Sequence, residues 1–299
     1  MYNYSLIDLK DAYARNQNIT RILRDRSGSS SNDQSAILIA YDLQAGSYVQ
    51  ALSDPDHRKA AERYADTIAS VLRPLNVRSL LEPGAGEATT LQNVVSRLNL
   101  TLGTPILGYD ISWSRVDVGR RYLKAHGIPA KLFVGELEAI PLSDNAVDVV
   151  FTSHAVEPNH GREAEILTEL YRVAGRFLVL FEPCYELASP DARARMEHYG
   201  YCRGLRETAE RMGWNVIAHR LIESPINPLN PTAVLVIEKA AEECGAIMPE
   251  YHCPSCRHPL VLAKEFYYCA AEGLAYPILD QIPCLSRPTA ILATRLLDE

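Results

Sequence analysis

The chain has 299 residues, of which 47% are hydrophobic, so it is long enough for two domains and a sizeable core. Its formal net charge of −7 disfavours a nucleic-acid-binding protein, which needs a cationic surface to neutralise phosphates. There is no apolar run of membrane length, and the N-terminal residues lack the pattern of a signal peptide, so we expect a cytoplasmic protein whose seven cysteines stay reduced or bind metal.

Residues 1–77 are predicted to form a helical N-terminal region. Apolar residues recur at roughly helical spacing over 6–23 and again over 54–72. Between these segments, the small polar residues of 26–33 predict a loop.

Residues 78–240 alternate short apolar runs with helical stretches. This alternation predicts an α/β fold in which parallel strands are joined by crossover helices. The candidate strands are 78–82, 106–110, 130–134, 147–153, 177–182, 214–219 and 233–237.

The first strand ends in a sequence that is typical of a cofactor-binding turn. After Glu82 the chain passes through Gly84 and Gly86 and enters a helix, which lets the backbone approach a ligand closely. A dinucleotide-binding fingerprint is excluded because Thr89 stands at its third glycine and no acid stands at 101–104. The acid available at the end of the second strand is Asp110.

These motifs resemble those of the class I S-adenosylmethionine (SAM)-dependent methyltransferases, in particular the broad group that acts on small metabolites. The resemblance covers residues 77–238 and implies a Rossmann-like, seven-stranded core that binds SAM. In the segment 133–150 it places Glu136 at the position of the usual aspartate beside the adenine amino group, and it assigns both ribose hydroxyls to Asp110. The cofactor-binding residues that it implies are Tyr41, Glu82, Gly84, Ala85, Gly86, Asp110, Ile111, Glu136, Leu137 and Ser153.

Tyr41 belongs to the segment 40–48, which resembles the stretch that many methyltransferases fold over the cofactor. Aromatic and amide groups there would exclude water from the sulfonium. In this interpretation Gly46 is a hinge of the lid. A plain junction between a helix and a loop explains the same residues equally well.

The catalytic candidates follow the fourth strand. A neutral acceptor such as a hydroxyl group must lose a proton during methyl transfer, and histidine suits that task near neutral pH. His154, His160 and Glu157 are the candidate bases, in that order of preference. The alternatives are that His154 packs against the methionine end of SAM and that His160 is a solvated loop residue. A further acid, Glu182, ends the fifth strand and is either a wall of the same cleft or a helix cap.

Residues 241–299 are predicted to form a small metal-binding module. Cys253 and Cys256 have the two-residue spacing of a zinc knuckle, and Cys269 follows. The segment 251–285 resembles the zinc-ribbon family to which activator subunits of tRNA methyltransferases belong, but Glu272 replaces that family's fourth cysteine. We therefore predict Cys253, Cys256, Cys269 and Glu272 as ligands, with Cys284, His252 or His258 as alternative fourth ligands and loss of the metal as a further possibility.

The sequence thus predicts a SAM-dependent methyltransferase that acts on a small polar metabolite, with O-methylation of a sugar or natural-product intermediate as the preferred reaction. The partner is then a small-molecule acceptor, with no nucleic acid and no membrane, and the sequence does not indicate an oligomeric state. One alternative is an RNA or protein methyltransferase guided by the C-terminal ribbon. The other is a catalytically silent scaffold protein.

Overall fold

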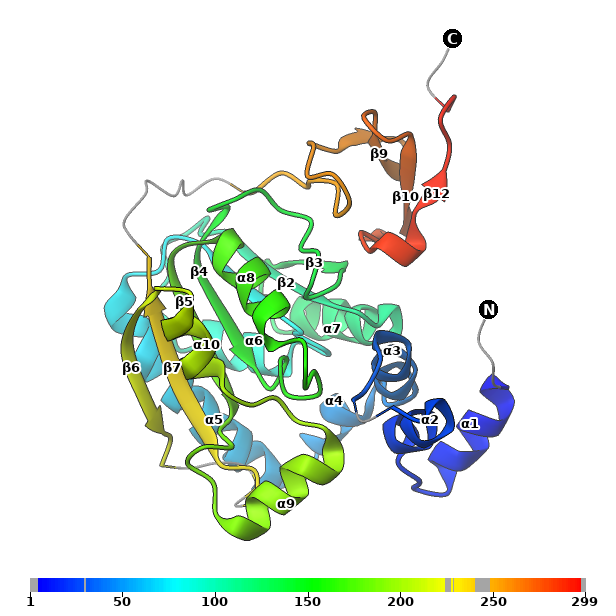
Figure 1. Ribbon diagram of the computed structural model, residues 1–299. Coiled ribbons are helices and arrows are strands. Elements are labelled where there is room, and N and C mark those ends of the chain that lie inside the picture. Colours follow the sequence, from blue (N-terminus) through cyan, green and yellow to red (C-terminus); the bar gives the residue numbers. More distant parts are fainter. Residues whose placement is uncertain (1–4, 30, 224–226, 228, 240–247, 297–299) are drawn as a thin grey trace.

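The computed structural model describes residues 5–29, 31–223, 227, 229–239 and 248–296, so the predicted boundary at 240–241 lies outside the described residues. Figure 1 shows N-terminal helices, a central α/β unit and a small C-terminal sheet. The helices are α1 (Leu6–Ala14), α2 (Ile19–Ser27), α3 (Gln34–Leu43), α4 (Ser47–Ala51), α5 (Pro55–Leu72), α6 (Thr89–Val95), α7 (Trp113–Ala125), α8 (Glu163–Val173), α9 (Pro190–Tyr199) and α10 (Leu205–Arg211), with 3-10 turns at Arg73–Leu75 and Arg287–Thr289. No helix in these ranges is long and apolar enough to cross a membrane.

The predicted helix over 6–23 is two helices, α1 and α2. The chain breaks at Asn16, which takes a positive φ of 57° that a helix interior does not tolerate. A new helix then begins behind Asn18, whose side chain accepts the Arg21 N–H as an N-cap. The second predicted helix is confirmed as α5, which is capped by Asp54 and has Pro55 in its first turn.

The predicted α/β fold is confirmed, with a seven-stranded sheet in the order β3-β2-β1-β4-β5-β7-β6. The strands are β1 (Leu80–Pro83), β2 (Ile106–Asp110), β3 (Lys131–Val134), β4 (Val147–Ser153), β5 (Ala174–Pro183), β6 (Asn215–Leu221) and β7 (Thr232–Glu238). The predicted parallel pairing is found among β1 to β5, whereas β7 pairs antiparallel with both β5 and β6. No helix lies in the described part of the β6–β7 connection, so these strands form a hairpin and not a crossover unit.

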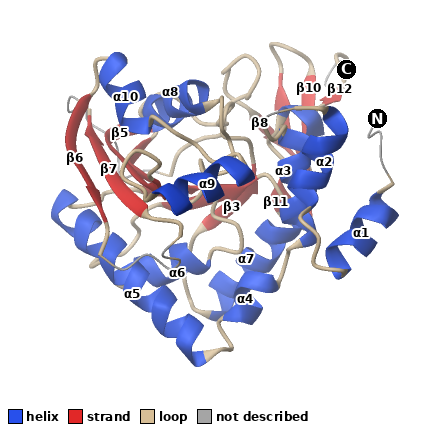
Figure 2. Ribbon diagram, turned by 60° about the horizontal axis from the view of Figure 1, so that its bottom comes forward, coloured by secondary structure: helices blue, strands red, loops and turns tan. Residues whose placement is uncertain are grey.

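Helices cover both faces of the sheet (Figure 2). Successive side chains of a strand point to opposite faces, so Leu80 packs in the core with α5, α6 and α7, whereas Leu81 packs in the core with α8 and α10. Val149 and Val150 divide in the same way on β4. Both faces of the central strands β1, β2 and β4 are covered, so these strands are buried along almost their whole length, as expected for the centre of such a sheet, whereas the edge strand β6 is partly exposed.

The C-terminal residues form an antiparallel sheet that packs against the β3 edge of the main sheet (Figure 1). Val134 of β3 forms a parallel bridge with Cys284, and its carbonyl oxygen accepts the Leu285 N–H at 2.8 Å. The two parts also share one buried cluster, which contains Cys253 and Tyr276 together with Phe133 of β3. The strands are β8 (Val261–Ala263), β9 (Phe266–Cys269), β10 (Leu274–Leu279), β11 (Ile282–Pro283) and β12 (Ile291–Leu292).

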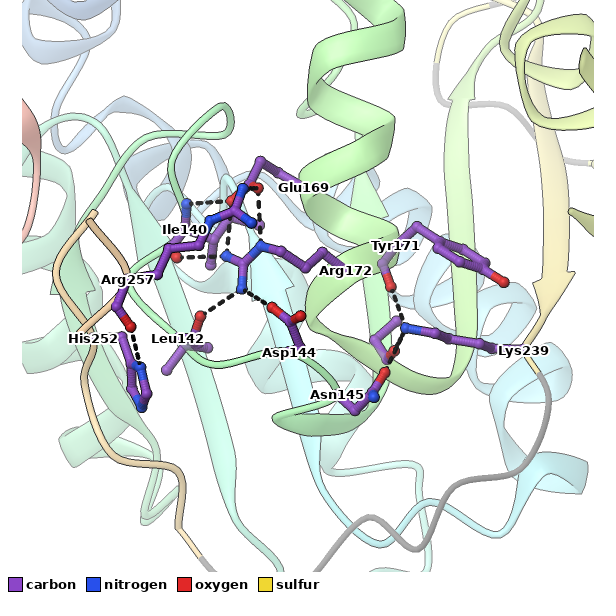
Figure 3. Close-up of polar contacts among 11 residues, drawn as sticks. Ile140, Leu142, Asp144, Asn145, Glu169, Tyr171, Arg172, Lys239, His252 and Arg257 are labelled. Atoms are coloured by element: carbon purple, nitrogen blue, oxygen red, sulfur yellow. Dashed lines mark hydrogen bonds and ion pairs between the residues drawn. The ribbon is translucent and has the colours of Figure 1, made fainter. Parts of the chain in front are cut away.

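An ion network centred on the buried pair Arg172 and Glu169 links the same two parts from the side of α8 (Figure 3). The Arg172 guanidinium donates to Glu169 at 2.8 Å and 2.9 Å and to Asp144 at 2.9 Å. Arg257, from the loop between the C-terminal cysteines, donates to the same Glu169 carboxylate at 2.8 Å. The C-terminal sheet is therefore held to the α/β unit by a shared apolar core and by paired charges.

Candidate active site

The turn after β1 brings the backbone close to its neighbours at two glycines. Gly84 and Gly86 have φ of +65° and +55°, a region that favours glycine. A Cβ atom built on Gly84 would lie 2.5 Å from the Ala155 Cβ atom, and one on Gly86 would lie 2.4 Å from Arg115 Nη2. Any side chain at either position would collide with the wall of the site.

Asp110, at the end of β2, is oriented by two backbone groups. Its Oδ2 accepts the Gly86 N–H and its Oδ1 accepts the Ser112 N–H, both at 3.0 Å. Ser112 in turn donates through Oγ to Asp42 of α3 at 2.6 Å, which ties the N-terminal region to this strand end. Each Asp110 oxygen keeps a free lone pair, so the carboxylate can accept two ribose hydroxyls without losing either backbone bond.

Two cavities lie along the carboxyl ends of the strands. The first, about 70 Å³, is lined by Gln34, Ile37, Tyr41, Gly84, Tyr109, Asp110, Ile111, Arg115, Gly135, Leu137, Glu138, His154, Ala155, Pro158, Asn159 and Arg162. The second, about 310 Å³, is lined by Tyr41, Tyr48, Leu52, His57, Ala61, Tyr64, Glu82, Gly84, Ala85, Glu87, Thr89, Thr90, Asn93, Arg115, Ser153, His154, Glu157, Asn227, Asn230 and Thr232. Both share Tyr41, Gly84, Arg115 and His154, which therefore mark their junction.

Most of the predicted cofactor residues line these cavities. The first contains Asp110, Ile111 and Leu137, the second contains Glu82, Ala85 and Ser153, and Tyr41 and Gly84 border both. The predicted lid segment therefore contributes Tyr41 to the site.

Gly86 and Glu136 are the exceptions, because they line neither cavity, although the Gly86 N–H binds Asp110. The second exception, Glu136, has a different environment. It is buried, which raises the pKa of its carboxyl group, and its Oε2 accepts the Arg287 N–H from the C-terminal sheet at 3.3 Å. Glu138, two residues further on, lines the first cavity instead. The C-terminal sheet therefore contacts the loop that borders the first cavity.

Glu82 provides a test of whether the predicted cofactor fits. Its Oε2 atom is buried without a hydrogen-bond partner, and burial raises the pKa of the carboxyl group well above its usual value. An acceptor without a donor is costly in a native fold and calls for an explanation. The ammonium group of the SAM methionine end would supply the missing donor, so the residues present fit the cofactor.

His154 is fixed by hydrogen bonds at both ring nitrogens. It directly follows β4 and has a positive φ of 56°, which ends the extended backbone of the strand. Its Nδ1 makes a short hydrogen bond to Glu157 Oε2, and its Nε2 lies 3.1 Å from Thr232 Oγ1. Asn230 donates to the same Glu157 oxygen at 3.2 Å. The sequence did not indicate Asn230 and Thr232 as partners of this histidine.

The His154–Glu157 pair carries opposite pKa shifts. Burial lowers the pKa of His154, but the Glu157 charge and hydrogen bond outweigh it and leave the pKa above its usual value. Burial likewise raises the pKa of Glu157, and the attraction of His154 outweighs it and leaves that pKa lowered. The pair thus favours an imidazolium next to a carboxylate, as expected for two groups that stabilise each other's charge.

Glu182 faces the backbone of the His154 loop and lines neither cavity. Its two oxygens accept the Ala155 and Glu157 N–H groups, each at 3.0 Å. Burial raises the pKa of Glu182 to about 7. It therefore positions the segment that carries the pair, and the interpretation of Glu182 as a wall of the cleft is wrong.

His160 also lies outside both cavities. Its Nδ1 is 3.0 Å from Glu163 Oε1 at the start of α8, and its side chain is 36% exposed. This position matches the alternative interpretation of His160 as a solvated loop residue.

Three of the four predicted metal ligands lie close together. One ligand atom from each of Cys253, Cys256 and Cys269 lies within 4.8 Å of the others, and the Tyr276 hydroxyl lies 3.3 Å from the Cys253 sulfur. Glu272 does not join this group: its side chain is exposed, while its backbone N–H bonds to the Cys269 sulfur. The turn that would carry a fourth cysteine is thus present, and the longer glutamate side chain extends into solvent.

Comparisons with known proteins agree with this geometry. Residues 80–175 match the family described as a methyltransferase domain. Among solved structures, the chain is similar to magnesium protoporphyrin IX methyltransferase from Synechocystis PCC 6803 with bound S-adenosylhomocysteine (SAH), at 13% identity and a TM-score of 0.53, over 70% of this chain and 100% of that one. It is also similar to a putative sarcosine dimethylglycine methyltransferase from Galdieria sulphuraria, at 15% identity and a TM-score of 0.50, over 62% of this chain and 88% of that one. No curated protein matches.

The matched residues run from β1 to the start of β5 and include the glycine turn, Asp110 and the His154–Glu157 pair. Both similar structures share the sheet around them, and at these identities the likeness concerns the fold. Residues 80–175 therefore form a methyltransferase domain within a class I, SAM-dependent methyltransferase fold.

Proposed function

We propose that this protein transfers a methyl group from SAM to a hydroxyl oxygen of a small polar metabolite, such as a sugar or a natural-product intermediate. The observation that carries the proposal is the His154–Glu157 pair at the junction of the two cavities. A partly buried imidazole oriented by a carboxylate is an arrangement that can accept a proton from a hydroxyl group.

When bound, SAM would supply the electrophilic methyl group, whose bond to sulfur breaks so that SAH is the leaving group. Asp110 would hold the ribose, and Gly84, which lines both cavities, would border the methionine end of the cofactor. His154 Nε2 exchanges its bond to Thr232 for the acceptor hydroxyl and takes its proton as the new bond to carbon forms. Glu157, held in turn by Asn230, stabilises the imidazolium that results. Alignment of the acceptor and removal of its proton together supply the rate enhancement.

The size and polarity of the second cavity support a small, polar acceptor. The second cavity, at about 310 Å³, falls near the lower end of the range for small-molecule sites. Tyr64 and Ser153, whose hydroxyls lie 3.1 Å apart, and Asn230 give its wall the donors and acceptors that a hydroxylated molecule needs. One similar structure is named for sarcosine and dimethylglycine, which makes an amine the second acceptor class to test.

The test begins with calorimetric titration of the purified protein with SAH. Binding at one site per chain is expected. The protein is then incubated with SAM carrying a ¹³C-labelled methyl group and a panel of sugars, phenols and amines, and NMR distinguishes methyl carbon bound to oxygen from methyl carbon bound to nitrogen. Transfer to nitrogen alone would contradict the oxygen assignment. Absence of SAH binding would favour the silent scaffold.

We further propose that Cys253, Cys256 and Cys269 hold a zinc ion, since three thiols gathered in a partly buried site are soft ligands that suit zinc. Elemental analysis of the purified protein is expected to give one zinc per chain, and Cys256→Ser to lose it together with thermal stability. Glu272→Ala is the matched control and is expected to keep the metal, because that side chain points into solvent. Metal-free wild-type protein, or equal loss in both variants, would contradict the proposal.

A further inference from the structure

The side chain of Asn230 is held at the wall of the second cavity. Asn230 comes just before β7, is 7% exposed, and lines this cavity together with His154 and Glu157. Its backbone N–H donates to the Asn227 carbonyl oxygen at 2.8 Å, and its own carbonyl oxygen accepts the Thr232 hydroxyl at 3.3 Å. The amide group therefore extends from a backbone that is bonded on both sides.

The Glu157 carboxylate determines the orientation of this amide. Asn230 Nδ2 lies 3.2 Å from Glu157 Oε2 and 3.4 Å from His154 Nδ1. A carboxylate only accepts hydrogen bonds, so the amide must direct its NH₂ group to Glu157 and turn its oxygen away.

The oxygen of the same amide lacks a donor. Asn230 Oδ1 is buried, and no residue that the structure describes donates a hydrogen bond to it. A buried acceptor without a donor is costly and calls for a partner. Asn227, from the same loop, also lines the second cavity, but it is exposed and its Oδ1 accepts the Leu229 N–H at 2.9 Å. The missing donor is thus particular to Asn230, and a molecule in the second cavity can supply it.

The surroundings of this oxygen favour an uncharged donor. In the proposed reaction His154 becomes a cation when it takes a proton, and it lies against the same amide. A second cation beside it, such as an ammonium group, would be repelled. A hydroxyl group supplies a donor without a charge.

We infer that the second cavity is a site for a vicinal diol, in which Asn230 Oδ1 accepts one hydroxyl and His154 faces the other, the one that is methylated. His154 and Asn230 both bind Glu157, so they stand close enough to contact neighbouring substituents of one molecule. The reacting oxygen gains the methyl group as its proton passes to His154 and SAH is released, whereas the second hydroxyl is unchanged. The inference rests on the proposed function for the identity of the base, and it makes Asn230 a specificity-determining residue.

The experiment compares ring molecules that differ by one hydroxyl group, each titrated into the SAH complex and followed by NMR. Catechol is compared with phenol, and the cis-cyclohexanediol with adjacent hydroxyls is compared with cyclohexanol, so the two arms distinguish an aromatic diol from a sugar-like one. We expect the wild type to bind at least one diol about 10-fold more tightly than its partner with a single hydroxyl, because the buried oxygen gains its donor.

Asn230→Ala removes that oxygen, so the preference for the diol is expected to fall to within about twofold. A loss of support for Glu157 would weaken both members of a pair and leave their ratio unchanged. Asn227→Ala is the matched control and is expected to keep the preference of the wild type. Resorcinol, whose hydroxyls are one carbon further apart, is expected to bind as phenol does.

The inference is overturned if the wild type shows no preference for either diol, a result that does not depend on the folding of any variant. It is also overturned if Asn230→Ala keeps the preference. Failure of the proposed function is distinguishable from both results. If the wild type binds no SAH, that function fails, and the same ratios measured on the ligand-free proteins decide the inference.

Discussion

Replacing Asp110 by alanine is expected to weaken SAH binding at least 100-fold. Two ribose hydroxyls would lose hydrogen bonds to a carboxylate, each worth about 1.5–3 kcal/mol, and about 3 kcal/mol in total corresponds to roughly a 100-fold change in Kd. The substitution also frees the Gly86 and Ser112 N–H groups, so the glycine turn loses the acceptor that holds it against β2. Calorimetric titration of the variant with SAH measures the effect.

Asp117→Ala is the matched control for this prediction. Asp117 lies on α7, seven residues beyond Asp110, and pairs with Arg120 and Arg121 outside both cavities. Its loss is expected to leave the Kd for SAH unchanged. If Asp110→Ala binds SAH as tightly as this control does, Asp110 is not the ribose ligand.

Local sequence patterns predicted the half of the site that lies on consecutive parallel strands. The position of an acid or a glycine turn directly after a buried strand can be predicted, because the carboxyl ends of parallel strands lie at one edge of the sheet. Glu82 and Asp110 therefore lie at that edge as expected, and β1 and β2 pair in register there. His154 at the end of β4 follows the same rule.

The partners of His154 escaped prediction because β7 runs the other way. In an antiparallel strand the residues at the start, not the end, lie at the edge that carries the site. Asn230 and Thr232 stand just before and at the start of β7, so they meet His154 across the sheet. The absence of a predicted helix between the last two strands was the available signal for this reversal.

Contacts between distant segments also escaped prediction. Glu136 matched a motif position, but the C-terminal sheet supplies the Arg287 N–H that binds its side chain. Arg115 stands inside a helix with no motif around it, and its guanidinium lies over the rings of Tyr41 and Tyr48, more than 60 residues earlier in the sequence. Such contacts depend on how the segments pack, which periodicity and spacing do not encode.

Replacing His154 by alanine is expected to lower the turnover number by about 10²- to 10⁴-fold, the usual contribution of a general base, with little change in the Kd for SAH. His160→Ala is expected to keep most of the turnover, because His160 lies outside both cavities. Steady-state kinetics with the acceptor found in the screen, alongside calorimetry with SAH, separates the two effects. Loss of SAH affinity with little loss of turnover would make His154 a cofactor contact.

The pH dependence of turnover is a second test of His154 as the base, because it depends on the protonation state of the His154–Glu157 pair. Only neutral imidazole accepts a proton, and the Glu157 carboxylate raises the pKa of His154, so turnover is expected to rise with pH through a midpoint above about 6.5, the usual value for histidine. Glu157→Gln removes the charge that stabilises the imidazolium, so its midpoint is expected to move to lower pH. Its turnover at high pH is expected to stay below that of the wild type, because the imidazolium formed during proton transfer is less stable. A midpoint that is the same in both proteins would mean that His154 is not the group that titrates, and the base would then have to be sought among the other residues that line the second cavity.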